Sequence, residues 1–336
     1  MPLIQVDHVS KNYKVIVQRP GAKNVLKNIF CPETKTVQAV RDISFSIEEG
    51  ELVGFIGENG AGKSTTLKMV SGILFPTYGE ITVSGICPYL KREKNARNIG
   101  AVFGQRSRLN WDLSMIDSFE LNKEIYRIDS CQFQKNVDMF VEMLHMQDFC
   151  HTPVRQLSLG QRMKAEVALA LLHDPSILYL DEPTIGLDVL AKQQIREFIR
   201  ERNRQSGMTT ILTSHDMKDL DSVCKRIIIL SKGSILFDGA IERFKQKYTT
   251  TSVAEFTYAE KNTDMAAELP HRHLKVIEDK DHRLTVSYPP SEITTAQLVG
   301  MVSECYRIND FVIKAPDIED MVRGIYEREE KISFSS

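Results

Sequence analysis

The 336-residue chain has almost no excess of charge of either sign, with 43 Lys and Arg against 45 Asp and Glu and a formal net charge of −2 at pH 7. A basic excess over a whole domain is the usual sign of a nucleic-acid-binding protein, so DNA or RNA would need a local argument here. The six cysteines form no C-x-x-C pair, which argues against a zinc site. The composition therefore favours reduced thiols and no nucleic-acid partner.

Long apolar runs are also missing. The longest, such as AEVALALL and RIIIL, are far shorter than the roughly 20 residues that a membrane-spanning helix needs. Residues 1–15 lack the basic-then-apolar order of a signal peptide. No repeat of fixed period and no low-complexity segment is visible. We therefore expect a chain that does not cross a membrane by itself, although it can lie against one.

The patterns that are present predict two domains. From Ile4 to about Gly239, short β-branched runs alternate with helical patterns, which is typical of an α/β fold with a largely parallel sheet. Within this part, residues 106–160 have helical spacing of Met, Leu and Phe, which predicts an inserted helical subdomain. Beyond it, shorter strand and helix patterns alternate. The sequence thus predicts one domain over residues 1–240 and a small α+β domain over residues 241–336.

A glycine-rich phosphate loop is the clearest motif. GENGAGKS, residues 57–64, matches G-x-x-x-x-G-K-[ST], follows the predicted strand ELVGFI and precedes a helical pattern. Glycines let backbone N–H groups turn inward around a phosphate, and the following helix points its positive end there. We expect Lys63 to reach the β- and γ-phosphates, Ser64 to hold Mg²⁺ and Thr65 to contact the α-phosphate. The predicted phosphate-binding residues are Gly57, Glu58, Asn59, Gly60, Ala61, Gly62, Lys63, Ser64 and Thr65.

An acidic pair follows a second apolar strand. ILYLDEPT, residues 177–184, places Asp181 and Glu182 at the carboxyl end of a predicted buried strand, where ligands bind in such folds. Asp181 is suited to the Mg²⁺ shell, and Glu182 to orient or deprotonate an attacking water. Two adjacent acids are more often solvated loop charges, but a phosphate loop in the same chain favours the functional interpretation.

The motifs together resemble those of the nucleotide-binding subunits of ABC transporters, over residues 1 to about 240. In chain order they are the phosphate loop at 57–64, a Q-loop glutamine at Gln105 in AVFGQ, the signature LSLGQ at 157–161, the acidic strand at 177–182, a D-loop with Asp188 in GLD, and a switch histidine at His215 in LTSHD. The resemblance implies a P-loop NTPase fold with a RecA-like core, and ATP hydrolysis with Mg²⁺. It also implies that His215 bonds the γ-phosphate and the attacking water.

The resemblance assigns further residues to a composite site between two copies of the chain. It implies that the hydroxyl of Ser158 and the backbone amide of Gly160 face the γ-phosphate of ATP held by the second copy. It also implies that Gln161 starts the helix aimed at that ATP, and that Asp188 contributes to the same site. Gln105 would report γ-phosphate and water occupancy and contribute to the Mg²⁺ site, whereas the plain alternative is an exposed turn residue. Leu159 stands where the family commonly has glycine, so its side chain must point away from the nucleotide. It is a candidate brake on turnover.

The adenine contact is expected from an aromatic residue near the N-terminus, and Tyr13 is the candidate. An insertion over residues 15–40 separates Tyr13 from the strand pattern RDISFSIEEG and is longer than the usual hairpin, with Phe30 as a less favoured substitute. The charged residues of the insertion are mostly basic: Arg19, Lys23, Lys27 and Lys35, compared with one acidic residue, Glu33. It could contact anionic lipid headgroups or a partner subunit, or be a solvated loop.

The segments KGSILFDGAIERFKQKY and DFVIKAPDIEDMVRGIYEREE look like those of ATPases paired with ABC-2 type permeases, which mostly export drugs, lipids, polysaccharides or peptides. The implied partners are separate transmembrane permease subunits and a second copy of this chain, at the cytoplasmic face of the cell membrane. The alternatives are an importer ATPase, or a non-transport ABC ATPase acting on ribosomes or DNA. A single ATPase unit, with no long coiled coil and no zinc cysteines, disfavours the latter.

Overall fold

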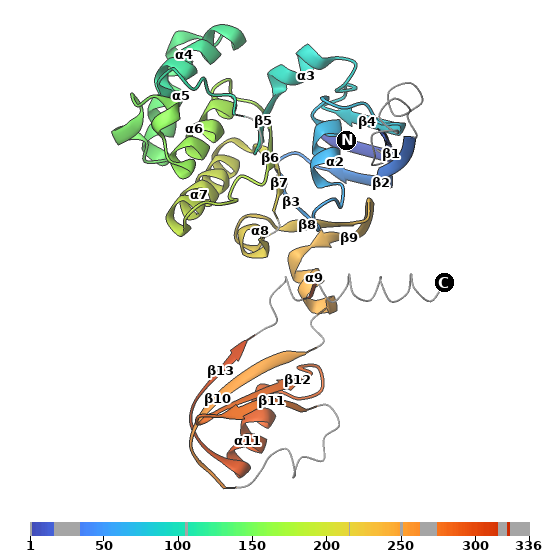
Figure 1. Cartoon of the computed structure of the whole chain (residues 1–336), viewed down its shortest axis with the longest axis vertical. Coiled ribbons are helices and arrows are strands. Elements are labelled where there is room, and N and C mark those ends of the chain that lie inside the picture. The colour runs from blue at the N-terminus through green and yellow to red at the C-terminus, as the bar shows by residue number, and fades with distance from the viewer. Residues whose placement is uncertain are drawn as a thin grey trace, which may run out of the picture. The chain divides into compact units, whose positions relative to one another are not determined.

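The computed structural model divides the chain into two compact units, residues 1–241 and 242–336 (Figure 1). It describes residues 2–16, 34–104, 107–214, 216–248, 251–262, 274–314 and 321–322. Gln105, His215, Phe30 and most of the insertion after Tyr13 lie outside the described residues. Among the helices that the structure describes, none is long and apolar enough to span a membrane.

A six-stranded sheet forms the centre of the larger unit, with strand order β5-β6-β7-β3-β8-β9. Its strands are β5 (Ile99–Phe103), β6 (Ile177–Asp181), β7 (Thr209–Thr213), β3 (Leu52–Ile56), β8 (Arg226–Ser231) and β9 (Ser234–Ala240). The first five run parallel, and β9 pairs antiparallel at one edge. Both faces are covered, which explains why the strands are almost continuously apolar. Their carboxyl ends therefore meet at one edge, where polar residues follow.

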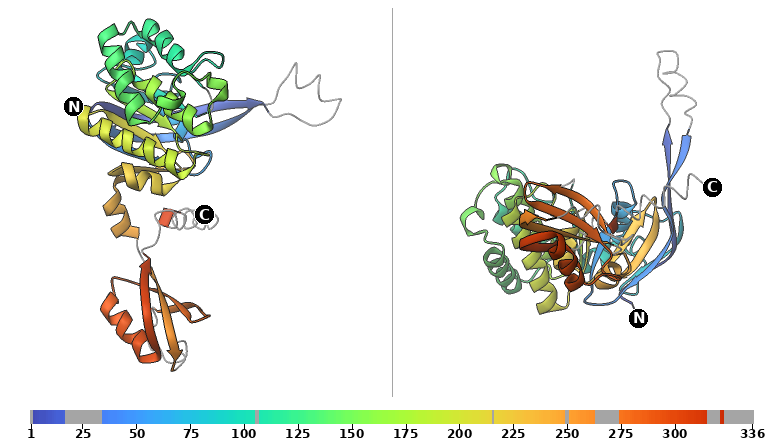
Figure 2. Two further views of the ribbon diagram at one scale, coloured as in Figure 1. Left: turned by 90° about the vertical axis from the view of Figure 1, so that its left-hand side faces the viewer. Right: turned by 90° about the horizontal axis from the view of Figure 1, so that it is seen from below.

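A second, antiparallel sheet has the order β2-β1-β4 and consists of β1 (Ile4–Ile16), β2 (Thr34–Ile47) and β4 (Tyr78–Val83). Helix α2 (Lys63–Val70) contacts all three of these strands and also β6 of the central sheet. The β1–β2 hairpin extends past the end of β4 (Figure 2). The predicted insertion is thus partly strand, because β2 begins at Thr34 and not at the RDISFSIEEG pattern.

Helix α2 lies on one side of the central sheet in Figure 1, and most of the other helices of the larger unit gather on the opposite side. They are α4 (Met115–Tyr126), α5 (Ser130–Met143), the 3₁₀ turns η1 (Gln147–Phe149) and η2 (Val154–Gln156), α6 (Leu159–Leu171) and α7 (Val189–Ser206). The short helices α3 (Arg92–Asn98) and α8 (Met217–Val223) complete the unit. Helix α6 packs directly on β5, because a Cβ on Gly100 would lie 2.4 Å from the carbonyl oxygen of Ala170.

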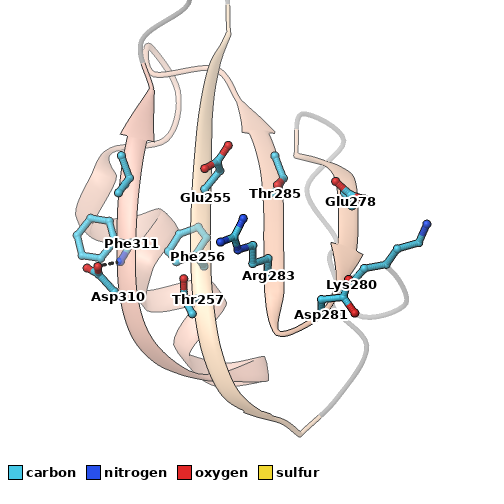
Figure 3. Close-up of a pocket in the computed structure, with 11 residues that line it drawn as sticks. Glu255, Phe256, Thr257, Glu278, Lys280, Asp281, Arg283, Thr285, Asp310 and Phe311 are labelled. Atoms are coloured by element: carbon cyan, nitrogen blue, oxygen red, sulfur yellow. Dashed lines mark hydrogen bonds between the residues drawn. The ribbon is translucent and has the colours of Figure 1, made fainter.

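The smaller unit is an antiparallel four-stranded sheet with the order β11-β12-β10-β13. Among the described residues, its elements are α9 (Ile241–Tyr248), β10 (Ser252–Lys261), β11 (Lys275–Lys280), β12 (Arg283–Tyr288), α11 (Thr295–Cys305) and β13 (Tyr306–Lys314). Leu298 and Val302 of α11 pack with Phe256 and Val286 on one face of the sheet. The other face borders a hollow of about 590 Å³ whose lining includes charged side chains such as Glu255 and Arg283 (Figure 3).

The two glycines Gly100 and Gly300 provide a matched test of this packing. Gly100→Ala should lower the free energy of unfolding of the larger unit by about 1–3 kcal/mol, the usual cost of overpacking, because the added Cβ meets the Ala170 carbonyl. Gly300→Ala in α11 should instead stabilise the smaller unit by up to about 1 kcal/mol, since no atom of the described residues lies within 4 Å of its added Cβ. Urea unfolding of both variants measures the difference, and equal effects would contradict the packing described.

Candidate functional site

The phosphate loop, residues 57–62, joins the end of β3 to the start of α2. Gly60 and Gly62 have φ angles of 84° and 105°, in the left-handed region that favours glycine. A Cβ on Gly62 would lie 2.8 Å from the carbonyl oxygen of Ala39, and one on Gly57 would lie 2.6 Å from that of Leu230. Gly57 and Gly62 are therefore required by the close approach of neighbouring strands, whereas Gly60 is favoured by its φ angle.

Lys63 is buried at the start of α2, with a relative exposure of 6%. Its Nζ donates to the carbonyl oxygens of Gly57 at 2.6 Å and Glu58 at 3.2 Å, and it lies 3.9 Å from Oε1 of Glu182. Burial lowers the pKa of Lys63, and the carboxylates of Glu182 and Asp181 partly oppose that shift. A buried ammonium is costly unless anions compensate it, so the phosphate loop favours an anionic ligand.

The carboxyl ends of three adjacent strands bring polar groups together beside Lys63. The register aligns Phe103 of β5, Asp181 of β6 and Thr213 of β7. Oδ1 of Asp181 accepts hydrogen bonds from Oγ of Ser64 at 3.0 Å and from Oγ1 of Thr213 at 2.8 Å. Mg²⁺ is usually bound through one or two carboxylates together with substrate phosphates and waters, so the Ser64–Asp181 pair is suited to that ion.

Glu182 adopts a left-handed conformation with a φ angle of 53°. Such a backbone costs free energy in a non-glycine residue and persists only where neighbouring groups impose it. Here the Glu182 N–H donates to Oγ1 of Thr213 at 2.9 Å and to the Thr213 carbonyl oxygen at 3.2 Å. Thr213 therefore holds both acidic residues, and sequence reasoning missed it. Its only signal was a hydroxyl at the end of an apolar strand.

Tyr13 lies on β1, which pairs with β2, the strand that borders the phosphate loop. Ala39 of β2 approaches Gly62, and the hairpin register pairs Lys11 with Val40 and Tyr13 with Val37. Tyr13 therefore lies about 7 Å further along the hairpin than Ala39, given a rise of about 3.3 Å per residue. Nζ of Lys11 lies 5.4 Å from the centroid of the Tyr13 ring.

The signature residues form the N-terminus of α6. Ser158 is the N-cap: its Oγ accepts from the Gln161 N–H at 3.2 Å, and Oε1 of Gln161 accepts from the Ser158 N–H at 2.9 Å. This reciprocal pair is a capping box. The helix thus begins at Leu159. The prediction that Gln161 starts the helix is wrong, because Gln161 is its third residue.

The start of α6 packs against the D-loop. A Cβ on Gly160 would lie 3.1 Å from Cβ of Ala191 and 3.9 Å from Oδ2 of Asp188. Asp188 caps α7, because its Oδ1 accepts from the Ala191 N–H at 2.8 Å. Leu159 is 42% exposed, and its Cδ2 lies 3.1 Å from where a Cβ on Gly186 would stand. In the described residues, the signature thus contacts residues 186–191. The phosphate loop and the start of α2 instead lie beside Asp181 and Glu182.

A buried charge cluster connects the segments that flank these residues. Asp219 of α8 is 1% exposed and accepts from Nη1 of Arg196 at 3.0 Å and from the hydroxyl of Thr184. Lys192 donates to Oδ2 of Asp216 at 2.9 Å. The cluster thereby connects three segments to one another: the residues just after Glu182, helix α7, and the residues just after position 215. Sequence reasoning missed it, because a buried Asp in a helix looks like a solvated one.

Comparisons with known proteins agree with this arrangement. A family model described as ABC transporter matches residues 40–185. The ABC transporter ATP-binding protein NatA of Bacillus subtilis (strain 168) is 34% identical over 213 residues, which are 63% of this chain and 86% of that protein. The methionine import ATP-binding protein MetN of Aliivibrio fischeri is 28% identical over 306 residues, which are 88% of this chain and 87% of that protein.

Solved structures show the same fold. A dimeric ATP-binding cassette in a post-hydrolysis state, bound to ADP and Pi, has a TM-score of 0.59 and 26% identity, over 71% of this chain and 98% of that chain. A dimeric bacterial ABC transporter cassette has a TM-score of 0.60 and 25% identity over the same shares. The predicted fold class, a P-loop α/β core with added helices, is confirmed.

The Asp219 cluster can be tested by stability. Asp219→Ala should lower the free energy of unfolding by about 3 kcal/mol, because removing one partner of a buried ion pair leaves the other charge uncompensated at a cost of about 3–5 kcal/mol, and Arg196 and Lys192 are partly exposed. Glu201→Ala, which removes the partner of the exposed Arg204 on the same helix α7, should change stability by no more than about 1 kcal/mol. Chemical unfolding monitored by circular dichroism separates the two, and an Asp219→Ala variant as stable as the parent would disprove the cluster's role.

Proposed function

Because this chain belongs to the family of ABC transporter ATP-binding proteins and is an ATPase of that family, we propose that it drives export through a separate ABC-2 type membrane permease. The assignment of ATPase activity is supported by one observation: Lys63, Glu182 and the Ser64–Asp181 pair lie close together at the carboxyl ends of adjacent strands. The proposal of export rests on the resemblance of residues 232–248 and 310–330 to the ABC-2 branch.

The hydrolytic step is assigned to Glu182, with His215 and Gln105 as its helpers. The carboxylate of Glu182 would orient or deprotonate the attacking water, and the ammonium of Lys63 would hold the β- and γ-phosphates. Mg²⁺ would neutralise charge on the phosphates, held by Ser64 and Asp181 with Gln105. Tyr13 would stack on the adenine. The cost of burying Lys63 and of straining the Glu182 backbone supports these assignments, because the fold maintains both at this edge.

The second half of each ATP site is proposed to come from another copy of the chain. The hydroxyl of Ser158 accepts from Gln161 and still has its own proton to donate, so it can bond a γ-phosphate without losing the helix cap. The amide of Gly160 and the positive end of α6 add to that attraction, up to about 2 kcal/mol in favourable geometry. Exposed apolar side chains lie nearby in the chain and suit a protein contact: Leu159, Ile185, Val189 and Leu190.

Leu159 is compatible with this dimer. Its side chain packs beside Gly186 of the D-loop, and the neighbouring Ser158 hydroxyl and Gly160 amide remain at the helix start. A larger residue in place of glycine links the signature to the D-loop by direct contact. We propose that this contact slows opening of the dimer after hydrolysis and so acts as a brake on turnover.

A permease is proposed to dock on exposed apolar side chains of α4 and of the segments around α2 and α3. Leu121 and Ile125 of α4 are 49% and 67% exposed. Ile73, Phe75 and Leu90 are 50%, 47% and 71% exposed. A cytoplasmic helix of a permease could bury these side chains, which would place the chain at the cytoplasmic face of the cell membrane. ATP-driven closure of the dimer would then shift the permease between its two access states.

Import is the second candidate, because similarity to the methionine import ATP-binding protein extends over 88% of this chain and so includes most of the smaller unit. A role on ribosomes or DNA has no such support, and we propose no nucleic-acid partner.

Glu182→Gln should bind ATP with the affinity of the parent, lose steady-state hydrolysis and accumulate as an ATP-bound dimer, because the amide keeps the shape of the side chain but cannot accept a proton. Lys63→Ala is the contrasting variant and should lose nucleotide affinity itself. Calorimetric titration with ATP, phosphate release and light scattering measure the three properties. Hydrolysis by Glu182→Gln near the parental rate would refute its assignment as the base.

The proteins that co-purify with the chain test the direction of transport. A tagged chain extracted from membranes in detergent should bring down a polytopic permease, and in proteoliposomes this complex should hydrolyse ATP without any solute-binding protein. Recovery of a solute-binding protein that is required for hydrolysis would favour import instead. Recovery of ribosomes or DNA without a permease would contradict a transport role.

A further inference from the structure

Glu166 is a buried carboxylate in the middle of α6 that the proposed ATPase mechanism does not use. It is 6% exposed, and its side chain accepts a hydrogen bond from the hydroxyl of Ser107 and one from the N–H of Arg108, at 3.0 Å from Oε1 and 3.2 Å from Oε2. Burial raises the pKa of Glu166, and these hydrogen bonds oppose the shift. Both donors belong to the segment that comes directly after Gln105 and Arg106.

Two more contacts join this segment to the same side of the helical subdomain. The guanidinium of Arg162, one turn before Glu166 on α6, lies 5.6 Å from the centroid of the Trp111 ring. Nη1 of Arg155, in the turn that precedes α6, bonds Oδ1 of Asp112 at 3.1 Å. Residues 107–112 therefore lie along the side of α6 that carries Arg162 and Glu166, because positions four apart share one helix face.

The two ends of α6 have different surroundings. Its C-terminal part is fixed on the central sheet, where Gly100 approaches Ala170 and the ring of His173 bonds the carbonyl oxygen of Ile99 at 3.0 Å. Its N-terminal end carries Ser158 and Gly160 against the D-loop. Glu166 lies between them, about 12 Å from Ser158 at a rise of 1.5 Å per residue. It is therefore placed where displacement of residues 107–109 would act on the signature end.

We propose that Glu166 is a positioning residue that makes residues 107–109 and the signature end of α6 move as one body, so that a shift at the phosphates reaches the signature. This rests on the proposed ATPase site and adds a named connection to it. Arg162–Trp111 and Arg155–Asp112 are more exposed and support the connection, whereas Glu166 is its buried anchor. The carboxylate is suited to this role because it accepts from a hydroxyl and a backbone N–H of the segment at once.

A purely structural role for Glu166 would lead to a different result from the proposed one. Glu166→Ala leaves the Ser107 hydroxyl and the Arg108 N–H without this partner. Glu166→Gln is the conservative variant, because its amide oxygen still accepts from Arg108 and its NH₂ group can donate to the Ser107 hydroxyl. Asn136→Ala is the matched control: Asn136 of α5 is also buried in the helical subdomain, at 2% exposure, and its Nδ2 donates to the carbonyl oxygen of Leu172 at 3.0 Å.

The experiment uses the full chain carrying Glu182→Gln, so that bound ATP persists. In that parent, ATP should slow hydrogen exchange in peptides covering both residues 107–112 and 158–163 and should cause dimerisation. Adding Glu166→Ala should leave the ATP affinity of the monomer unchanged, abolish the ATP-dependent protection at 158–163 while keeping that at 107–112, and weaken ATP-dependent dimerisation about tenfold, within the usual range of coupling between sites. Glu166→Gln should restore most of both effects, and Asn136→Ala should leave them at parental values.

Each other outcome has a distinct meaning. If Glu166→Ala protects residues 158–163 and dimerises like its parent, the inference is wrong and the proposed function stands. The same holds if Asn136→Ala loses protection as Glu166→Ala does, since general loosening of the helical subdomain then explains the result. If the parent itself neither binds ATP nor dimerises with it, the proposed function fails, and the inference falls with it.

Discussion

The buried ammonium of Lys63 is the constraint on which the rest of the larger unit depends. Two backbone carbonyl oxygens of the phosphate loop accept from it, and the carboxylates of Glu182 and Asp181 lie close enough to oppose the lowering of its pKa by burial. Burying a cation in this way is unfavourable unless negative charge is close. The loop has to bend tightly to supply its carbonyls, and the strands have to end in register to supply the acids. In the proposed site, an ATP phosphate would bring further negative charge to the same ammonium.

The register of the parallel strands places the acidic residues beside Lys63. Asp181 and Thr213 stand opposite each other at the ends of β6 and β7, and the hydroxyl of Thr213 then bonds the Asp181 carboxylate and receives the Glu182 N–H. A shift of one residue would turn each of these side chains to the other face of the sheet. The chemistry proposed for Glu182 thus depends on packing of the apolar strand interiors far from any ligand.

Helix α6 links this edge of the sheet to the surface where a second copy is proposed to bind. Its C-terminal part lies on β5 with almost no space between backbones, and its N-terminus packs on the D-loop. Between them, Glu166 holds the segment that follows Gln105. One helix therefore touches the central sheet, the segment next to the Q-loop and the D-loop, so a change at the phosphates has a short physical route to the proposed dimer surface.

The sequence by itself determined the features that depend on neighbours along the chain. The phosphate loop between a strand and a helix, the helix start near residues 158–161, and the apolar strand ending in Asp181 all follow from local spacing, and they indicated the family and the fold. Gln105 and His215 remain predictions from that pattern. What only the tertiary structure decided are contacts between residues far apart in the chain: Thr213 with Asp181, 32 residues away, Asp219 with Thr184, 35 away, and Glu166 with Arg108, 58 away. Local spacing carries no information about such pairs, because strand register and helix packing set which side chains meet.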